Sequence, residues 1–180
     1  MRLGRAIALL LGRSGMDVAI GYHRSARQAR RTVRDLERTG ARGVALAADL
    51  ADPGAARRLV RRAARALGGL DVLVNSAARF ERTPLAATTP ARYARLLDLN
   101  LRGAFFCAQA AALRGEGIAV NCVAPGPVLR PRGFPRARWQ RLTRGRAGSP
   151  ADVAAAVLFF ATCPRYITGQ ILNVDGGEAR

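Results

Sequence analysis

Lysine is absent from this chain of 180 residues, so every strongly basic side chain is an arginine. Cysteine is scarce: Cys107, Cys122 and Cys163 are widely spaced, which supports neither a disulfide framework nor a zinc site. The single histidine, His23, cannot make a metal site unaided. No apolar run reaches the ~18–20 residues of a membrane span, so we expect no membrane association.

The ends and the composition indicate one globular protein. The hydrophobic fraction is 49% and the charged fraction 23%, which is typical of a folded chain and not of a disordered one. Met1–Leu11 has a charged and then an apolar part, but no small-residue cleavage site follows. We therefore expect a cytoplasmic protein with a single domain over residues 1–180.

The formal net charge is +18, with 30 basic and 12 acidic residues. Such an excess favours binding to polyanions, and arginines cluster on two expected helices. The clusters are Arg27, Arg30, Arg31, Arg34 and Arg38, and Arg57, Arg58, Arg61, Arg62 and Arg65. Runs of this kind are usually solvated helix faces, so we expect any binding to DNA or RNA to be non-specific and sensitive to salt.

The hydrophobic pattern alternates between helix and strand, which predicts an α/β fold with parallel strands. Asp52-Pro53, Thr89-Pro90 and Ser149-Pro150 mark helix starts. The expected helices cover 2–14, 26–39, 53–67, 89–113 and 151–162, the expected strands 17–22, 43–48, 71–74, 118–123 and 170–174, and an irregular stretch runs to Gly148.

Seven segments of the chain resemble, in their order, the short-chain dehydrogenase/reductase family, closest to its pteridine-reductase-like members. They are Leu3–Ala8, Tyr22–Ser25, Ala48–Leu50, Asp71–Ala77, Leu99–Leu101, Val120–Val128 and Thr168–Gly177. The resemblance implies a Rossmann-like, doubly wound parallel sheet. It also implies an oxidoreductase lineage that reduces small carbonyl or pterin substrates, in which homo-oligomers occur.

The resemblance also implies a cofactor site. Gly4 matches the last glycine of a phosphate-binding turn at a helix N-terminus. Arg24 and Ser25 suit a 2′-phosphate, and no acidic residue stands there to select a free 2′-hydroxyl, so NADPH is favoured over NADH. The full set of expected cofactor-binding residues is Leu3, Gly4, His23, Arg24, Ser25, Asp49, Leu50, Asn75, Ser76, Ala77, Pro125, Gly126 and Val128.

Two parts of the family pattern are missing. The chain begins inside the phosphate-binding turn, so we expect the first strand of the sheet to be absent. Leu113–Gly117 then leads directly into the expected strand at Ile118, where the family inserts its fifth strand with a catalytic Ser and a helix with Tyr-x-x-x-Lys. From ~30 residues for a βαβ unit, this gap is on the order of 40–60 residues. The expected sheet is therefore incomplete.

The missing segment is the part of the family pattern that supplies the proton donor for carbonyl reduction. Reduction of a carbonyl needs a proton donor at the developing alkoxide, and the family uses a Tyr whose pKa is lowered by a nearby ammonium. No lysine exists, and Tyr22, Tyr93 and Tyr166 do not match the catalytic position. Only Asn100 matches a member of the catalytic tetrad.

Three readings of the sequence stay open. The chain is a family member that has lost catalysis and keeps weak affinity for NADPH, or an arginine-rich binding protein on a degenerate scaffold. In the third reading it is a fragment of an active reductase, produced by an error in the gene model. The substrate and the oligomeric state do not follow from the sequence.

Overall fold

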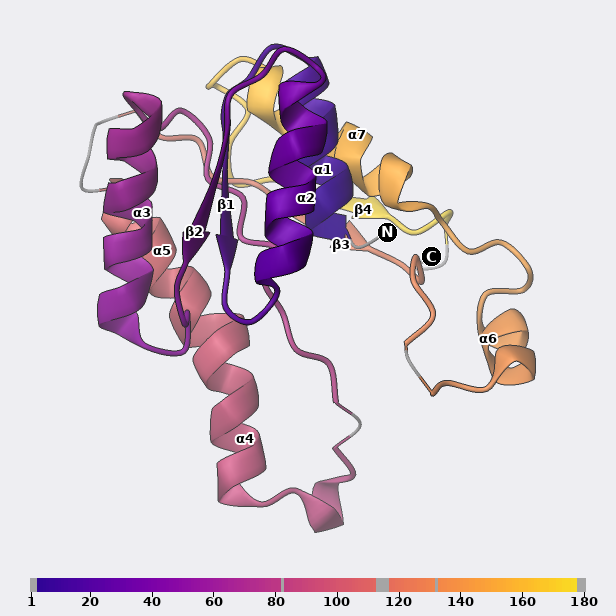
Figure 1. Cartoon of the computed structure of the whole chain (residues 1–180). Coiled ribbons are helices and arrows are strands. Elements are labelled where there is room, and N and C mark those ends of the chain that lie inside the picture. The colour runs from indigo at the N-terminus through magenta and orange to yellow at the C-terminus, as the bar shows by residue number, and fades with distance from the viewer. Residues whose placement is uncertain (1–2, 82, 113–116, 132, 178–180) are drawn as a thin grey trace. The chain divides into compact units, whose positions relative to one another are not determined.

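The computed structural model describes residues 3–81, 83–112, 117–131 and 133–177 (Figure 1). The helices are α1 (Leu3–Arg13), α2 (Ala26–Glu37), α3 (Pro53–Leu67), α4 (Pro90–Leu97), α5 (Ala104–Ala112), α6 (Arg136–Leu142) and α7 (Pro150–Thr162), with a 3₁₀ turn η1 (Leu85–Ala87) and a π-helical segment η2 (Asp98–Gly103). The strands are β1 (Val18–Tyr22), β2 (Gly43–Ala47), β3 (Cys122–Pro125) and β4 (Ile171–Val174).

The chain divides into two compact units, each described below by itself. One comprises Gly12–Glu116, and the other comprises Met1–Leu11 with Gly117–Arg180. The single domain expected for residues 1–180 stays a prediction.

A parallel strand pair is the centre of the unit Gly12–Glu116. β1 and β2 pair in register from Val18 opposite Gly43 to Tyr22 opposite Ala47. Helices α2 and α3 each contact both strands but not each other, and Figure 1 shows them on either side of the pair. This is the β-α-β-α arrangement that the alternating pattern predicts.

Capping residues set both ends of helix α3. The Asp52 carboxylate accepts hydrogen bonds from the amides of Gly54 (2.8 Å) and Ala55 (3.2 Å), and Pro53 takes the first helical position. These bonds, led by that from Gly54, lower the pKa of Asp52. Gly68 ends the helix with φ +84°, a conformation that glycine adopts without steric cost. The expected helix 53–67 is confirmed.

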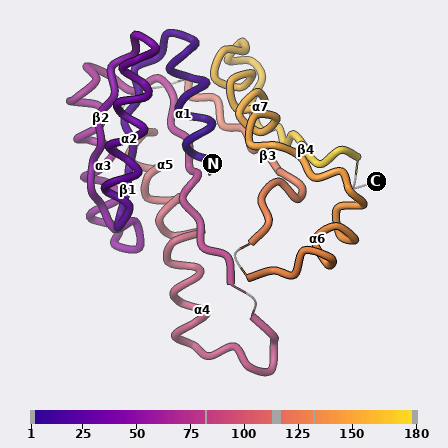
Figure 2. The backbone as a smooth tube through the Cα atoms, turned by 45° about the vertical axis from the view of Figure 1, so that its right-hand side comes forward, coloured from indigo at the N-terminus to yellow at the C-terminus, as the bar shows by residue number. Residues whose placement is uncertain are grey.

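One long helix was expected from residue 89 to 113, and its start at Thr89-Pro90 is confirmed: the Thr89 hydroxyl accepts from the Arg92 amide at 3.3 Å. The helix changes to π-helical geometry at Asp98–Gly103 before α5 continues it, and Figure 2 shows the backbone leading from α4 into α5. Gly103 is buried, and a Cβ atom there would lie 2.6 Å from the carbonyl oxygen of Leu50. Glycine therefore permits this close approach. Leu113, the expected last residue, lies outside the described residues.

The core of this unit forms where α3 and α5 pack together. Its buried residues are Ala56, Val60, Cys107 and Ala110, and Leu50, Leu70, Leu73, Phe106 and Ala111 pack against them. Burial raises the pKa of the Cys107 thiol, so this cysteine packs as a small apolar residue. At the rim, the Arg57 guanidinium lies 4.3 Å from the centre of the Phe106 ring and donates to Gln109 Oε1.

The second unit contains the other strand pair. β3 and β4 are parallel, from Cys122 opposite Ile171 to Pro125 opposite Val174, and α7 contacts both. The Asn121 side chain donates to the Ile167 carbonyl (2.9 Å) and accepts from the Gln170 amide (3.0 Å), which holds the entry to the pair. Helix α7 starts at the expected Ser149-Pro150 cap. The Ser149 hydroxyl accepts from the Asp152 amide and the Asp152 carboxylate accepts from the Ser149 amide, which together form a capping box.

Two expectations for this unit were wrong in detail. The strand expected at 118–123 begins only at Cys122. At Val120 the carbonyl accepts from the Gly169 amide at 2.8 Å, but the amide donates to the Thr168 hydroxyl at 3.0 Å and not to a backbone carbonyl, so the ladder is interrupted there. The stretch expected to be irregular contains helix α6, in which Trp139 packs edge-on against Phe134, with ring centres 6.2 Å apart. The contact between Phe134 and Trp139 packs α6 locally, and the many arginines of this stretch gave no hydrophobic pattern from which the helix could be predicted.

The strand expected at Asp71–Val74 does not form. Within the described residues, no backbone hydrogen bond joins this segment to another, although Val72–Val74 are half-buried. In a doubly wound sheet of order 3-2-1-4-5-6, this segment would be strand 4, between strands 1 and 5. Neither of those strands is present among the described residues. An extended segment with neither neighbour has no ladder to join.

The fold class is confirmed as α/β and Rossmann-like, with a parallel sheet that is incomplete as described. In the described residues the strands form two separate parallel pairs, β1-β2 and β3-β4. No helix within the described ranges is both long and apolar enough to span a membrane.

Hydrogen exchange tests the unpaired segment. We expect the amides of Val72, Leu73 and Val74 to exchange at least tenfold faster than those of Val18 and Ala48, because amides without a partner lack protection. The control amides donate to the carbonyls of Arg42 (2.9 Å) and Tyr22 (2.8 Å). Equal protection of both sets, measured by NMR in D₂O, would show that the segment is paired after all.

Candidate functional site

The expected site residues fall into two groups, one in each unit. His23, Arg24, Ser25, Asp49, Leu50, Asn75, Ser76, Ala77 and Asn100 belong to the unit Gly12–Glu116, and Leu3, Gly4, Pro125, Gly126 and Val128 to the other. Each group is described by itself, and the assignment of these residues to a site stays a prediction.

The turns after β1 and β2 meet at one edge of the sheet, because the strands are parallel. There His23 Nε2 lies 3.8 Å from Asp49 Oδ2, with both side chains about half exposed (51% and 49%). The other oxygen of Asp49 accepts a hydrogen bond from the Ala51 amide at 3.0 Å. The structure thus brings together two of the expected residues from different segments.

Arg24 and Ser25 lie exposed in the turn that leads into α2. Ser25 is the residue that caps this helix, yet its side chain makes no capping hydrogen bond. The Arg24 guanidinium has neither an ion-pair nor a hydrogen-bond partner among the described residues. A cation and a hydroxyl are therefore both available to an anion at this helix start, which is the donor set that a 2′-phosphate requires.

Leu50 and the segment Asn75–Ala77 are positioned differently from one another. Leu50 is half-buried and packs against the α3–α5 core. Asn75, Ser76 and Ala77 are exposed, in the continuation of the segment that joins no sheet. Packing against the core therefore holds Leu50 in place. Asn75, Ser76 and Ala77, which would line a cofactor, have no neighbouring strand in the described residues to hold them.

Asn100 has a structural partner that sequence reasoning missed. From the π-helical segment, its side chain accepts from the Arg79 amide (2.8 Å) and donates to the Arg79 carbonyl (2.9 Å). Both hydrogen-bonding groups of one loop residue are thus satisfied by a single amide side chain. Asn100 ties the loop that follows Asn75–Ala77 to the helix, a role for which the sequence carries no local signal.

Glu81 makes a second connection between the same loop and α4. Its carboxylate lies 3.2 Å from the Arg95 guanidinium and 3.6 Å from those of Arg92 and Arg79. The hydrogen bond from Arg95 is the largest of the effects that together lower the pKa of Glu81. The carboxylate is exposed enough to be screened by solvent, so it positions the loop more than it stabilises the fold.

In the other unit, Leu3 and Gly4 form the first turn of α1, and Gly4 is exposed. Pro125 ends β3, and the Gly126 amide continues the ladder by donating to the Val174 carbonyl at 3.1 Å. A Cβ atom on Gly126 would lie 2.8 Å from Asp175 Cα. Contact with backbone therefore requires glycine here, whether or not a cofactor is bound.

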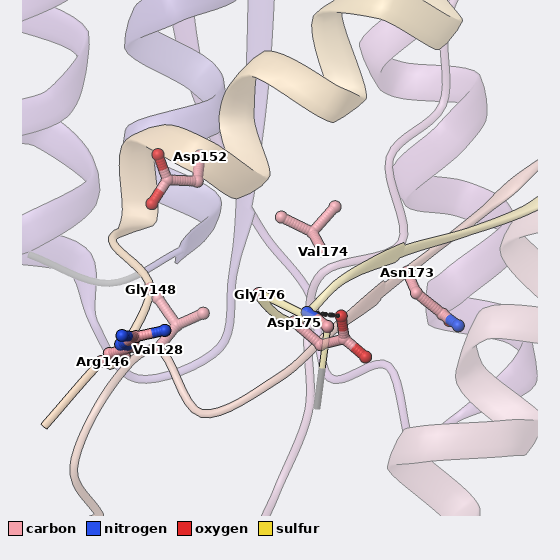
Figure 3. A pocket seen from close by; sticks show the side chains of 9 residues that line it. Val128, Arg146, Gly148, Asp152, Asn173, Val174, Asp175 and Gly176 are labelled. Atoms are coloured by element: carbon pink, nitrogen blue, oxygen red, sulfur yellow. Dashed lines mark hydrogen bonds between the residues drawn. The ribbon is translucent and has the colours of Figure 1, made fainter. Parts of the chain in front are cut away.

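Val128 lines a cavity of about 470 Å³ at the ends of β3 and β4 (Figure 3). The other residues around it are Arg146, Gly148, Asp152, Asn173, Val174, Asp175, Gly176 and Gly177. Asp175 accepts from the Gly177 amide (2.9 Å), and Asp152 accepts from the Ser149 amide (2.7 Å), which lowers the pKa of Asp152. Among the residues that line this cavity, only Val128 was predicted from the sequence to belong to a site.

The three tyrosines are the phenols that this chain offers as proton donors. Tyr93 and Tyr166 are exposed, at 59% and 99%, and no phenol oxygen among the three tyrosines has a hydrogen-bond partner in the described residues. The sequence contains no lysine to lower a phenol pKa. No group of His, Cys, Asp and Glu in the described part of the chain could hold a metal ion.

A family model described as "Enoyl-(Acyl carrier protein) reductase" matches residues 2–114 and 108–178. The 3-oxoacyl-[acyl-carrier-protein] reductase of Synechocystis sp. is 27% identical, over 97% of this chain and 92% of that protein.

Two solved structures are similar to this chain. A short-chain dehydrogenase from Burkholderia cenocepacia, in complex with NADP, is 33% identical with a TM-score of 0.91, and the match covers 99% of this chain and 94% of that one. A blue fluorescent protein from a metagenomic library, in complex with NADPH, is 30% identical with a TM-score of 0.90, over 100% of this chain and 94% of that one.

The matches contain a break. The two pieces matched by the family model meet at residues 108–114. The alignment with the Synechocystis protein runs over 236 positions, whereas 97% of this chain is about 175 residues, so about 61 positions have no counterpart here. The break falls at the end of α5, beside Leu113–Gly117.

Replacing Asn100 tests its connection to the loop. We expect Asn100→Ala to lower the free energy of unfolding by about 1 kcal/mol, because two hydrogen bonds to Arg79 are lost at an exposed site. Asn100→Asp should lose less, since its carboxylate still accepts from the Arg79 amide. Gln28→Ala, at an exposed position on α2, is the control, and urea unfolding gives all three values. An Asn100→Ala protein as stable as the wild type would contradict this role.

Proposed function

This chain belongs to the short-chain dehydrogenase/reductase family, and we propose that it is a member that retains weak affinity for NADPH but lacks hydride-transfer catalysis. The observation that carries the proposal is the break in the family match at residues 108–114 in a chain without lysine. Its lineage is that of oxidoreductases acting on small molecules.

The argument against catalysis is chemical. Reduction of a carbonyl develops negative charge on oxygen, which must be protonated by a positioned donor. The tyrosines of this chain lie in β1, in α4 and before β4, and their hydroxyls have no hydrogen-bond partner among the described residues. Asn100, the one residue that matches the tetrad, uses its side chain to hold Arg79.

The argument for NADPH rests on the turn between β1 and α2. When bound, the cofactor would supply a hydride, and the residues of this chain would only hold it. Arg24 would pair with the 2′-phosphate and Ser25 would donate a hydrogen bond to it, because neither side chain has another partner among the described residues. Two similar structures with NADP or NADPH bound support this choice over NADH.

The resemblance and the relatives indicate a broad substrate class. The sequence resemblance points to a small carbonyl or pterin compound, and one relative is a 3-oxoacyl-[acyl-carrier-protein] reductase. We propose a cytoplasmic protein on the same grounds of resemblance.

The competing interpretation is a gene-model error that removed a coding segment. Sequencing the locus and the transcript across the codons for Leu113 and Ile118 separates the two. A continuous reading frame supports a genuine loss, whereas an additional coding segment with Ser and Tyr-x-x-x-Lys would restore the enzyme.

The purified chain should show no NADPH-dependent reduction of pterins, quinones, aldehydes or 3-oxoacyl thioesters above the rate without protein. The reason is that no tyrosine and lysine are available as proton donor and partner. The measurement is NADPH absorbance at 340 nm, with an active reductase of the family assayed in parallel as the positive control. Turnover that persists through repurification and scales with protein concentration would refute the proposal.

The cofactor preference has its own test. We expect NADPH to bind more tightly than NADH, and Arg24→Asp to weaken NADPH at least tenfold, since a charge-assisted hydrogen bond contributes about 1.5–3 kcal/mol. Arg30→Asp changes the net charge equally on the exposed face of α2 and should change the affinity less than threefold. Titration followed by nucleotide fluorescence gives the constants, and equal affinity of the wild type for both cofactors would count against Arg24.

A further inference from the structure

Four arginines of α2 and Arg38, the residue that caps its C-terminus, form one face of the helix, which we call the α2 arginine face: Arg27, Arg30, Arg31, Arg34 and Arg38. At about 3.6 residues per turn they fall within roughly 100° of the helix circumference. The buried residues Ala29, Thr32 and Leu36 lie on the opposite side and pack toward the β1-β2 pair. All five arginines are exposed, so the fold presents them together to the solvent.

Most of this charge is not neutralised. Only Arg38 has an ion-pair partner, Asp35 at 2.8 Å, and the described residues offer none to the other four. In α3, too, one arginine of five forms an ion pair, Arg58 with Asp52 at 3.4 Å. Two others are held by other contacts: Arg57 by the Phe106 ring and Gln109, and Arg62 by a hydrogen bond to the Ala47 carbonyl at 3.4 Å. The two helices therefore carry similar charge, but among the described residues four guanidinium groups lack a partner on α2 and two, Arg61 and Arg65, on α3.

The spacing of the α2 arginine face identifies the chemistry of a partner. Arg27, Arg31, Arg34 and Arg38 repeat at intervals of four, three and four residues, so one guanidinium occurs per turn, about every 5 Å along the axis. From Arg27 to Arg38 the row extends about 16 Å. A regular row of cations along a helix fits a polymer whose anions also repeat regularly, and each guanidinium can bond a phosphate through two N–H groups.

We propose that the α2 arginine face binds the phosphate backbone of nucleic acids, without reading their base sequence. Duplex DNA carries one negative charge per roughly 1.7 Å of axis, so the row can meet several phosphates at once. Side chains from one straight face contact backbone and not base edges, so sequence is not distinguished. The interaction does not depend on NADPH and uses none of the expected cofactor residues.

Two double variants of the full chain test the location. Arg27→Gln with Arg31→Gln removes two arginines from the α2 arginine face, and Arg61→Gln with Arg65→Gln removes two from α3. Both pairs are exposed, four residues apart and without described ion-pair partners, so each variant loses the same charge from the same kind of position. Circular dichroism and the unfolding temperature establish that both are folded, and Arg34→Gln against Arg61→Gln repeats the comparison with single changes.

The assay is fluorescence anisotropy of a labelled duplex of about 20 base pairs, without nucleotide cofactor, at several salt concentrations from ~0.05 to ~0.2 M. The α2 double variant should bind about tenfold more weakly at ~0.1 M salt than the wild type, and the α3 variant less than twofold. The slope of log affinity against log salt should fall by about 2 for the α2 variant, at about 0.9 per phosphate contact. A duplex of unrelated sequence should bind equally.

Three results would overturn the proposal. The first is equal weakening by the two double variants, which would mean that only the net charge matters. The second is no binding of the wild type at ~0.1 M salt. The third is displacement of the duplex by polyglutamate as effective, per charge, as displacement by unlabelled DNA, which would identify an acidic protein surface as the better partner.

Discussion

A β-strand is held in place by the strands beside it, and this requirement governs what remains of the sheet in this protein. β1 has β2, and β3 has β4, and each of these pairs forms in register. Asp71–Val74 is as apolar as any of them and has neither neighbour among the described strands. Because a backbone amide in an unpaired strand gains nothing over its bond to water, hydrophobicity alone does not make this segment a strand.

Each strand pair is also supported by side-chain packing or side-chain hydrogen bonds within its own unit. In the unit Gly12–Glu116, the core around Val60 and Cys107 joins α3 to α5, and Leu73 reaches that core although its backbone joins no sheet. Side-chain burial and ladder formation are therefore separate contributions here, and the first survives without the second. In the other unit, the side chains of Asn121 and Thr168 supply hydrogen bonds at the entry to the β3-β4 pair.

The same distinction explains how much could be predicted from the sequence. Helix starts were predictable because Asp52-Pro53 and Ser149-Pro150 act on the amides of the next turn. The apolar pattern of Asp71–Val74 predicted a strand and was wrong, because a strand also needs neighbours, and the resemblance already implied that both of its neighbours were missing. The cofactor-binding residues were predicted from the family resemblance, which does not tell whether the same residues also have a structural role. The structure gives Gly126 a backbone contact and Asn100 a loop to hold, and neither follows from periodicity or spacing.

The break in the family match bears on both the sheet and the proposed absence of catalysis. The match breaks at residues 108–114, which is where the resemblance implies a fifth strand and the Ser, Tyr and Lys of the active site. On the proposal made above, this one gap accounts for one missing neighbour of Asp71–Val74 and for the missing proton donor. The residues that would hold a 2′-phosphate, Arg24 and Ser25, are built by the β1-β2 pair alone, which needs no strand from the gap. The proposed affinity for NADPH is therefore compatible with the proposed absence of catalysis, because the turn that carries Arg24 and Ser25 needs no residue from the gap.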